Sequence, residues 1–275
     1  MRIISLCPSN TEILYALDAG EHVIALDDHS DWPLEWQHLP KVGPDLTIDM
    51  NKVEALQPDL VIASLSVPGM EKNIEELKTR NLPYIILNPS HISDIAENIR
   101  EVGRSINRIE KAEQVATHFT ERIEQIRMLT KHVNDRPTLY WEWWPNPLYT
   151  PGRTNWLTNV SELAGATNVF ADYNTDNVKT TRDQVAARNP DHIMVVWCGI
   201  EIKRIKSSMI KERPEWQQVT AIQKNDVHIL EEGLYCRPSP RLLEGLEQLI
   251  KILHPSLGIS LDKALLTTSS VPTEP

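Results

Sequence analysis

The sequence predicts an α/β protein in which two Rossmann-like lobes are joined by one long backbone helix, with a ligand cleft between them. Two observations favour this class. Short apolar runs rich in β-branched residues alternate with helical patterns in both halves of the chain, as in parallel sheets. Between the halves, apolar residues recur at helical spacing over residues 93–133, and neither Gly nor Pro occurs from Ile109 to Arg136. We interpret this stretch as one helix of about 25 residues, roughly 37 Å long.

This pattern divides the chain into four parts. Residues 1–105 are expected to form an amino-terminal α/β lobe, residues 106–134 the interdomain helix, and residues 135–255 a carboxy-terminal α/β lobe. The tail, residues 256–275, is polar and ends in proline-rich sequence, so we expect it to be partly disordered, with Leu261–Leu266 able to form a short helix.

The first lobe begins with a strand, a helix and a second strand. Arg2–Leu6 and Val23–Leu26 are the strands, and Ile13–Leu17 is the helix between them, preceded by the capping-box pattern Ser9–Glu12. Further along the chain the patterns predict a helix, a strand, a helix and a strand, at Lys52–Leu56, Asp59–Ala63, Glu71–Arg80 and Tyr84–Leu87.

The second lobe repeats this alternation. The patterns predict a strand, a loop, a helix, a strand and a closing helix, at Thr138–Trp143, Trp144–Gly152, Asn155–Ala164, Val227–Leu230 and Arg241–Leu253. Val53–Ile62 and Val185–Met194 also match each other, because each combines a helix end, a Pro-Asp turn and a strand. The match indicates either an internal duplication or a connector common to α/β proteins.

Composition excludes several classes of protein. The net charge of −10 and the lack of a basic run argue against a nucleic-acid binder. No apolar run approaches the roughly 20 residues that span a bilayer. The amino terminus lacks the pattern of a signal peptide, and three cysteines cannot all be paired in disulfides within one chain. We therefore expect a cytoplasmic protein as the sequence stands, or an extracytoplasmic one if a leader was removed.

Signatures of common enzymes are missing from the sequence. There is no Gly-rich phosphate loop, no G-x-S-x-G elbow and no H-E-x-x-H motif. Glu12 and Glu142 are carboxylates of the kind used in acid–base catalysis, but nothing in their spacing pairs them. We expect a binding protein without catalytic activity and without a cofactor of its own.

Four phrases carry a resemblance to a known family. They are ISLCPSNTE, SDWP, LQPDLV and RPSPR, which begin at Ile4, Ser30, Leu56 and Arg237. In this order, over about residues 1–255, they resemble the cobalamin-binding proteins of vitamin B12 uptake ABC transporters. Those proteins belong to the class III periplasmic binding proteins, or helical-backbone metal receptors, which carry corrinoids, haem or iron-siderophores between two lobes. Members of the family usually carry a signal or lipoprotein leader, and this sequence shows none.

The resemblance implies a ligand and a set of contacts. The ligand would be cobalamin or a related corrinoid, the partner a B12-type ABC permease, and the protein a monomer that closes by only a few degrees. Alternatives are a haem or iron-siderophore binder on the same fold, and a cytosolic corrinoid-handling protein or enzyme. By alignment with the family, the residues facing the ligand would be Pro8, Ser9, His29, Trp32, Leu65, Ser66, Tyr149, Gly152, Trp197, Cys198, Tyr235 and Arg237.

Aromatic residues support a flat ligand. A wide macrocycle needs apolar walls with a few polar groups at the rim, and the sequence holds eight Trp against two Phe. Trp32, Trp144 and Trp197 follow expected strands and are candidates for the cleft. Trp141 and Trp143 alternate along one expected strand, so we expect that side of the strand to pack in the core.

His29 is the candidate for direct contact with the metal of the ligand. A neutral imidazole binds cobalt or iron well and could replace a water or base on the axial face of a corrinoid. The alternative is a loop histidine that hydrogen-bonds a neighbouring carboxylate, Asp27, Asp28 or Asp31.

The cysteines and two acidic residues complete the candidates. Cys7, Cys198 and Cys236 each follow an expected strand and could meet at the cleft as thiolates, although buried apolar roles are more usual for scattered cysteines. In the family, one exposed acid on each lobe docks onto arginines of the permease. Glu71 and Glu201 match those positions, and each is alternatively an ordinary acid in the first turn of a helix.

Overall fold

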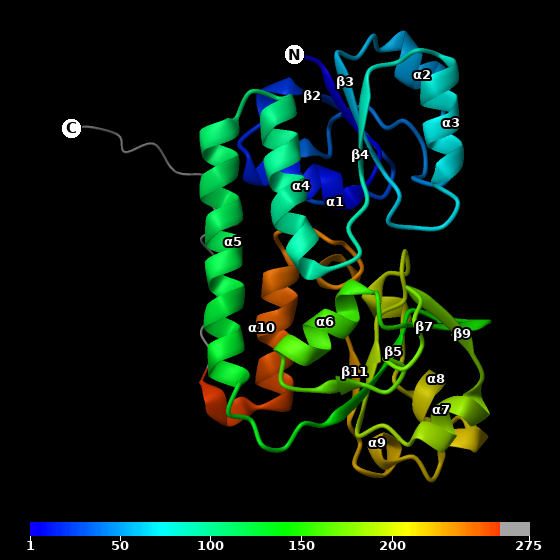
Figure 1. Ribbon diagram of the computed structural model, residues 1–275. Coiled ribbons are helices and arrows are strands. Elements are labelled where there is room, and N and C mark those ends of the chain that lie inside the picture. The colour runs from blue at the N-terminus through cyan, green and yellow to red at the C-terminus, as the bar shows by residue number, and fades with distance from the viewer. Residues whose placement is uncertain (259–275) are drawn as a thin grey trace.

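The computed structural model describes residues 1–258 and shows two α/β lobes beside one long helix (Figure 1). The amino-terminal lobe is the upper one in the figure and the carboxy-terminal lobe the lower. None of the helices described is both long enough and apolar enough to cross a membrane. The expected helix at Leu261–Leu266 lies outside the described residues.

The amino-terminal lobe is a parallel sheet covered by helices. Its elements are β1 (Ile3–Ser5), α1 (Pro8–Ala16), β2 (Val23–Leu26), α2 (Met50–Ala55), β3 (Leu60–Ser64), α3 (Glu71–Thr79) and β4 (Tyr84–Leu87). The strand order is β2-β1-β3-β4, and every pairing is parallel. β1 and β3 are buried throughout, as expected for central strands of a sheet with both faces covered.

The carboxy-terminal lobe contains a second parallel sheet and a small antiparallel one. Its elements are β5 (Thr138–Glu142), β6 (Trp144–Pro145), β7 (Leu148–Pro151), α6 (Trp156–Leu163), β8 (Thr167–Asn168), β9 (Asn177–Thr180), α7 (Arg182–Arg188), β10 (His192–Val195), α8 (Ser208–Lys211), α9 (Thr220–Gln223), β11 (Val227–Ile229) and α10 (Leu242–Leu253). The parallel sheet has the order β11-β10-β5-β8, and the antiparallel sheet has the order β6-β7-β9.

The two parallel sheets have the same topology. Numbered along the chain within each lobe, the strands of both sheets lie in the order 2-1-3-4. The matching phrases occupy equivalent places, since each leads into the third strand, β3 or β10. Gln57 and Asn189, one residue before the proline of each phrase, share a left-handed φ of 46°. The internal match therefore reflects a repeated lobe rather than a common connector alone.

The region expected to be one long helix is two helices. α4 (Ile92–Ser105) ends before Asn107, whose φ of 58° is left-handed, and α5 (Ile109–Thr130) then runs back along α4. Gly103 allows this tight pairing, because a Cβ there would lie 2.1 Å from the Cβ of Ala112. The apolar periodicity continues through both helices, so it could not reveal a reversal of direction made by one asparagine.

α5 is the element that joins the lobes. Its 22 residues reach about 33 Å, and it runs beside both lobes, with α4 next to it above and α10 below (Figure 1). Lys111 on α5 pairs with Asp18 of the first lobe at 2.6 Å, and Arg122 pairs with Glu247 on α10 at 2.7 Å. One continuous apolar core contains residues of both lobes and of this helix, among them Ile3, Phe119, Leu157 and Leu246.

Two further local expectations need correction. α1 begins at Pro8 with Cys7 as its N-cap, so Ser9–Glu12 lies within the helix and is not its capping box. Proline is favoured at the first helical position, and it moves the helix start ahead of Ser9. The expected loop 144–152 contains two strands, β6 and β7, which pair with each other. β7 also pairs with β9, which begins at Asn177, 26 residues after Pro151.

Candidate ligand-binding cleft

A cavity lies between the two lobes, at the carboxyl ends of β3 and β4 in the first lobe and beside the end of β7 and the start of β9 in the second. The first lobe contributes residues between 65 and 71 after β3 and residues 88–90 after β4, and the second contributes residues 154–156 and 176–177. The cavity volume is about 260 Å³. Ligands of α/β sheets bind outside the carboxyl ends of the strands, and this position is the one predicted for the cleft.

A buried ionic cluster joins the lobes. Glu12 on α1 is 1% exposed, and its carboxylate accepts hydrogen bonds from Arg237 at 3.2 Å and Arg241 at 3.1 Å, both from the second lobe. The hydroxyl of Ser239 donates to the other carboxylate oxygen. We call Glu12, Arg237, Ser239 and Arg241 the interlobe cluster. Burial without partners would make each of these charges costly, and the cluster pairs them across the boundary between the lobes.

Arg237, one of the residues expected to face the ligand, is the centre of this cluster. Besides Glu12, it donates to Asp31 at 2.6 Å and to Glu232 at 2.9 Å. Burial acts to raise the pKa of Asp31, but the hydrogen bond and the charge of Arg237 outweigh it, so this pKa lies below its usual value. Three carboxylates surround its guanidinium and 7% of its side chain is exposed, while its buried Nε has no hydrogen-bond partner within residues 1–258.

Trp32 is held at the same boundary. Its ring lies under the guanidinium of Arg241, whose central carbon is 4.6 Å from the ring centroid, and edge-on to Tyr15 at 4.5 Å. The ring is half-buried. Trp32 therefore connects α1 of the first lobe to the interlobe cluster, a contact that the sequence did not indicate.

Two of the expected ligand contacts are buried in the core of the second lobe. Trp197 is 6% exposed, and its indole donates to Glu142 at 3.0 Å. Arg213 binds the same carboxylate with two hydrogen bonds, at 2.5 and 2.8 Å. Tyr235 is fully buried, and its hydroxyl donates to the carbonyl of Gly245 at 2.8 Å. Packing and hydrogen bonds inside the lobe use both aromatic side chains, and their contact with a ligand stays a prediction.

Other aromatic side chains lie at the cleft. Trp156 lines the cavity and packs at 5.4 Å against Trp143, which is half-buried and whose buried indole nitrogen has no hydrogen-bond partner within residues 1–258. On the adjacent hairpin, Trp144 is 40% exposed and Tyr149 is 36% exposed. Trp141 lies in the core, as predicted, and Trp143 is partly buried and packs against the same core.

Sequence reasoning missed the polar part of the cavity. Asn155 caps α6 through its side-chain oxygen, which accepts from the backbone of Leu157 at 2.9 Å, and it lines the cavity together with Asp176. Gly152 lies just before it, and a Cβ there would come within 2.2 Å of the carbonyl oxygen of Thr175. An asparagine that follows a strand and precedes a helix is a recognisable cap, and it was the signal available in the sequence.

Four further expected ligand contacts of the first lobe lie either at the cavity or buried at the start of α1. Leu65 and Ser66 line the cavity. Pro8 and Ser9 are buried at the start of α1, where the hydroxyl of Ser9 lies 3.4 Å from the sulfur of Cys7. Only the first two therefore border the cavity directly.

His29 is half-exposed and close to a carboxylate. Its Nε2 lies 3.8 Å from an oxygen of Asp45, and its side chain is 50% exposed. Its backbone amide donates to Asp27 at 2.8 Å, and burial raises the pKa of that carboxyl to about 6. The expected carboxylate neighbour of the imidazole exists, but it is Asp45, which is distant in sequence, and the imidazole keeps enough exposed surface to meet a ligand.

Comparisons with known proteins assign the chain to a family. Residues 3–233 match the periplasmic binding protein family. The chain belongs to this family. A vitamin B12-binding protein of Vibrio cholerae is 29% identical over 256 residues, covering 92% of this chain and 88% of that protein. An ABC transporter substrate-binding lipoprotein of Bacillus subtilis is 28% identical over 259 residues, covering 92% of this chain and 80% of that protein.

Solved structures agree with the fold. The periplasmic vitamin B12-binding protein of Vibrio cholerae superposes with a TM-score of 0.77 at 26% identity, covering 92% of this chain and 96% of that one. A periplasmic haem-binding protein from Roseiflexus sp. RS-1 superposes with a TM-score of 0.81 at 21% identity, covering 93% of this chain and 98% of that one, which shows the shared fold alone. As a periplasmic binding protein, this chain is a substrate-binding component of ABC transport that works with a permease, is not an enzyme and needs no cofactor of its own.

The two acids expected at the permease follow equivalent loops of this periplasmic binding protein. Glu71 begins α3 after Gly69, and Glu201 follows Gly199, and both glycines have left-handed φ values of 105° and 71°. The carboxylate of Glu71 accepts from the backbone of Gly69 at 2.7 Å, while Glu201 contacts Lys203 and Arg204, each at 3.2 Å. Both acids are exposed on the rims of their lobes.

Two of the three cysteines meet. The sulfurs of Cys198 and Cys236 are 2.9 Å apart, and both residues are half-buried. Cys7 is separate from this pair and fully surrounded, and burial raises the pKa of its thiol to about 12. Burial likewise raises the pKa of Cys236. Cys7 therefore behaves as a small buried hydrophobe, whereas Cys198 keeps access to solvent near the cleft side of β10.

We expect the interlobe cluster to be strongly coupled. Glu12→Gln removes a carboxylate that two buried guanidiniums share, and Arg237→Gln removes a guanidinium that three carboxylates share, so each should lower the free energy of unfolding by up to about 3–5 kcal/mol. The double variant should lose less than the sum, because it removes both members of the pair. Urea unfolding followed by tryptophan fluorescence measures this. As a control, Glu76→Gln breaks the exposed pair with Arg80 and should change the free energy by less than about 1 kcal/mol. Additive losses in the double variant would contradict the coupling.

Alkylation should separate the cysteines. Under native conditions iodoacetamide should label Cys198 first and leave Cys7 unlabelled, because Cys7 is buried and its raised pKa removes the reactive thiolate. Mass spectrometry of tryptic peptides identifies the labelled residue. The Cys198→Ser variant should lose the rapid label, and rapid labelling of Cys7 in the folded protein would show that our account of its burial is wrong.

Proposed function

We propose that this periplasmic binding protein binds a corrinoid, cobalamin or a related cobamide, between its lobes outside the cytoplasm and delivers it to a B12-type ABC permease. One observation carries the proposal. Vitamin B12-binding proteins of Vibrio cholerae match this chain over 92% of its length, once by sequence and once by structure. One relative is a lipoprotein and another is periplasmic, which supports a location outside the cytoplasm.

The chemistry of the cleft fits a corrinoid. The macrocycle is flat and largely apolar, and the exposed faces of Trp144 and Tyr149 and the Trp143–Trp156 pair offer flat apolar surface. The amide arms of a corrinoid need donors and acceptors at the rim. Ser66, Asn88, Ser90, Asn155 and Asp176 supply them around the cavity. The unpartnered indole N–H of Trp143 is an additional donor for an amide oxygen.

Size constrains where the ligand lies. A corrinoid is larger than the cavity of about 260 Å³, so we place the ring in the open mouth of the cleft and its side arms in the cavity. In this arrangement Leu65, Ser66, Tyr149 and Gly152 border the ligand from both lobes. His29 and Trp32 follow β2, and Cys198 follows β10, so all three approach the mouth from the same strand ends.

Titration with two cobalamins tests the ligand and His29 together. Cyanocobalamin and aquocobalamin should each quench the tryptophan fluorescence of the protein saturably and with one-to-one stoichiometry. If His29 replaces the water on cobalt, only aquocobalamin should change its visible spectrum, and His29→Ala should abolish that change. His38→Ala is the matched control, since His38 is exposed and its imidazole lies 2.7 Å from a backbone carbonyl, that of Glu35. If aquocobalamin shows the same spectral change with His29→Ala as with the wild type, axial ligation by His29 is excluded.

The same titration decides between ligand classes. Haem is the second candidate, because haem-binding proteins share the fold. No quenching by either cobalamin, together with a Soret shift on adding haemin, would overturn the corrinoid proposal in favour of haem. An iron-siderophore would show quenching by ferric hydroxamates with neither of these signals.

We propose that Glu71 and Glu201 dock onto arginines of the permease. Both are exposed, one on each lobe, and apolar side chains that are also exposed, Val67 at 37% and Ile202 at 47%, lie within four residues of them. Glu71→Ala and Glu201→Ala should weaken binding to the permease in nanodiscs about tenfold or more each, because each removes a charge from the interface. Cobalamin binding should not change in Glu201→Ala, because Glu201, unlike Glu71, is not among the described residues that line the cavity. Exposed Glu75→Ala on α3 is the control, and wild-type affinity in both variants would contradict the docking role.

A further inference from the structure

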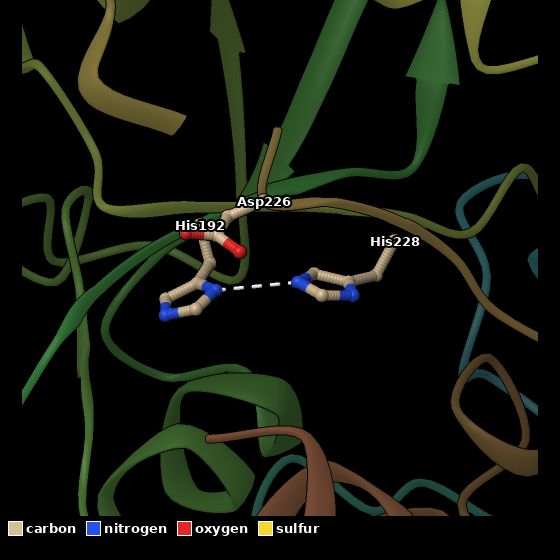
Figure 2. Close-up of side chains that lie close together, drawn as sticks. All are labelled: His192, Asp226 and His228. Atoms are coloured by element: carbon tan, nitrogen blue, oxygen red, sulfur yellow. Dashed lines mark hydrogen bonds between the residues drawn. The ribbon is translucent and has the colours of Figure 1, made fainter. Parts of the chain in front are cut away.

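We propose that His192, Asp226 and His228 form a binding site for a divalent transition-metal ion, with zinc as its best match. The three residues lie at the opposite ends of the strands from the cleft. His192 begins β10, Asp226 directly precedes β11, and His228 is the second residue of β11. Figure 2 shows the two imidazoles side by side, with the carboxylate of Asp226 next to His192. The site is independent of the proposed ligand of the cleft.

The sheet register brings these side chains together. β10 and β11 are parallel, and Met194 pairs with His228. Asp226 therefore lies level with His192, and the backbone amide of Ile193 donates to the carbonyl of Asp226 at 3.0 Å. Residues level with each other on parallel strands point to the same face, and so do residues two apart. All three side chains consequently share one face of the sheet.

The distances match those between ligands of a tetrahedral ion. Nδ1 of His192 and Nε2 of His228 are 3.2 Å apart, and one ligand atom from each of the three residues lies within 4.8 Å of the others. Two nitrogens bound to tetrahedral zinc at about 2.0–2.1 Å are about 3.3–3.4 Å apart. Two imidazoles and one carboxylate are also a common ligand set of zinc sites that keep one position for water.

The charge state of the residues suits a metal. Burial lowers the pKa of both histidines, so both imidazoles are neutral at pH 7. The groups that act on His192 are Asp226, Asp191, Lys224 and His254, and those that act on His228 are His192, Asp226 and Lys211. Within residues 1–258 the carboxylate of Asp226 makes no hydrogen bond or ion pair, so it is available as an anionic ligand.

A simple hydrogen bond between the two rings is the competing explanation. In that state one ring donates its N–H to the bare nitrogen of the other. Metal binding requires both facing nitrogens to be bare, with the protons on Nε2 of His192 and Nδ1 of His228. Going from one state to the other changes the tautomers and keeps the number of protons, so metal binding near pH 7 needs no net deprotonation of the imidazoles. Addition of metal therefore distinguishes the two explanations.

The position of the site gives it a structural consequence. β11 is an edge strand of three residues that pairs only with β10. The chain continues from β11 into the segment that holds Glu232 and Arg237 of the lobe boundary. An ion held by both strands would fix this edge and the start of that segment, so bound metal should stabilise the second lobe against unfolding.

Zinc titration of the untagged, chelator-treated protein tests the site. Isothermal titration calorimetry should show one zinc ion per chain for the wild type. His192→Gln and His228→Gln should each weaken binding at least tenfold, since loss even of a supporting hydrogen bond costs a zinc site 10–100-fold. Excess zinc should raise Tm of the wild type and leave the Tm of both variants unchanged. His38→Gln is the control and should behave as the wild type. Asp226→Asn tests the carboxylate if a histidine variant does not fold.

A second cluster of possible ligands makes the test sharper. Cys198, Glu232 and Cys236 also lie within 4.8 Å of one another, although Arg237 already binds Glu232. The variant Cys198→Ser/Cys236→Ser should retain the zinc affinity of the wild type. Loss of zinc binding in this variant, with wild-type affinity in His228→Gln, would overturn the proposal and assign the metal to the cysteines. No zinc binding by any form would also overturn the proposal. Neither outcome would bear on the corrinoid proposal for the cleft.

Discussion

The buried carboxylate of Glu12 is the constraint on which the arrangement of the two lobes depends. It comes from the first helix of the first lobe, and its partners, Arg237, Ser239 and Arg241, come from the last loop of the second lobe. A charge at this depth requires its partners, because the loss of water around it is offset only by close ionic hydrogen bonds. Separation of the lobes at this point would therefore expose several charged groups to water or leave them without ionic partners.

Two other features reinforce this link. α5 runs beside both lobes, and the apolar core is continuous from the first sheet through this helix to the second lobe. A hinge needs a few residues that can change φ and ψ without disturbing packing, whereas here the connection between lobes is a packed helix. The cleft is consequently formed before a ligand arrives, and binding need not supply free energy for a large closure.

Residues at the strand ends either hold the rigid lobes together or are available to contact a ligand. Residues such as Trp197, Tyr235 and Arg237 stand where a ligand could be contacted, but they hold the second lobe and the boundary together. Under the proposed function, recognition falls to the outer loops, where the rings of Trp144 and Tyr149 are exposed. One fold can serve several ligands, because binding depends on the site residues that the fold carries.

The sequence predicted local elements well wherever one signal dominated. β4 was expected at Tyr84–Leu87 and is found there, and the Pro-Asp phrases lead into equivalent strands of the two lobes. The prediction failed where the decisive contact was distant. Asn107 reverses the chain between α4 and α5, Pro8 starts α1 ahead of the expected cap, and β7 finds its partner β9 across an intervening helix. Of the candidate site, Leu65 and Ser66 were found at the cavity, whereas Asn155, Trp156 and Asp176 were missed.

The sequence by itself determined the class of fold, the repeated lobe and the family, because strand, helix and turn preferences act over a few residues and leave a readable pattern. Only the tertiary structure decided which charged and aromatic side chains are buried among partners inside the protein and which line the cavity. Glu12 and Arg237 are 225 residues apart, and each by itself resembles an ordinary polar residue of a helix or loop. Their roles follow from desolvation, which depends on what the whole fold places around a charge and on no local feature of the chain.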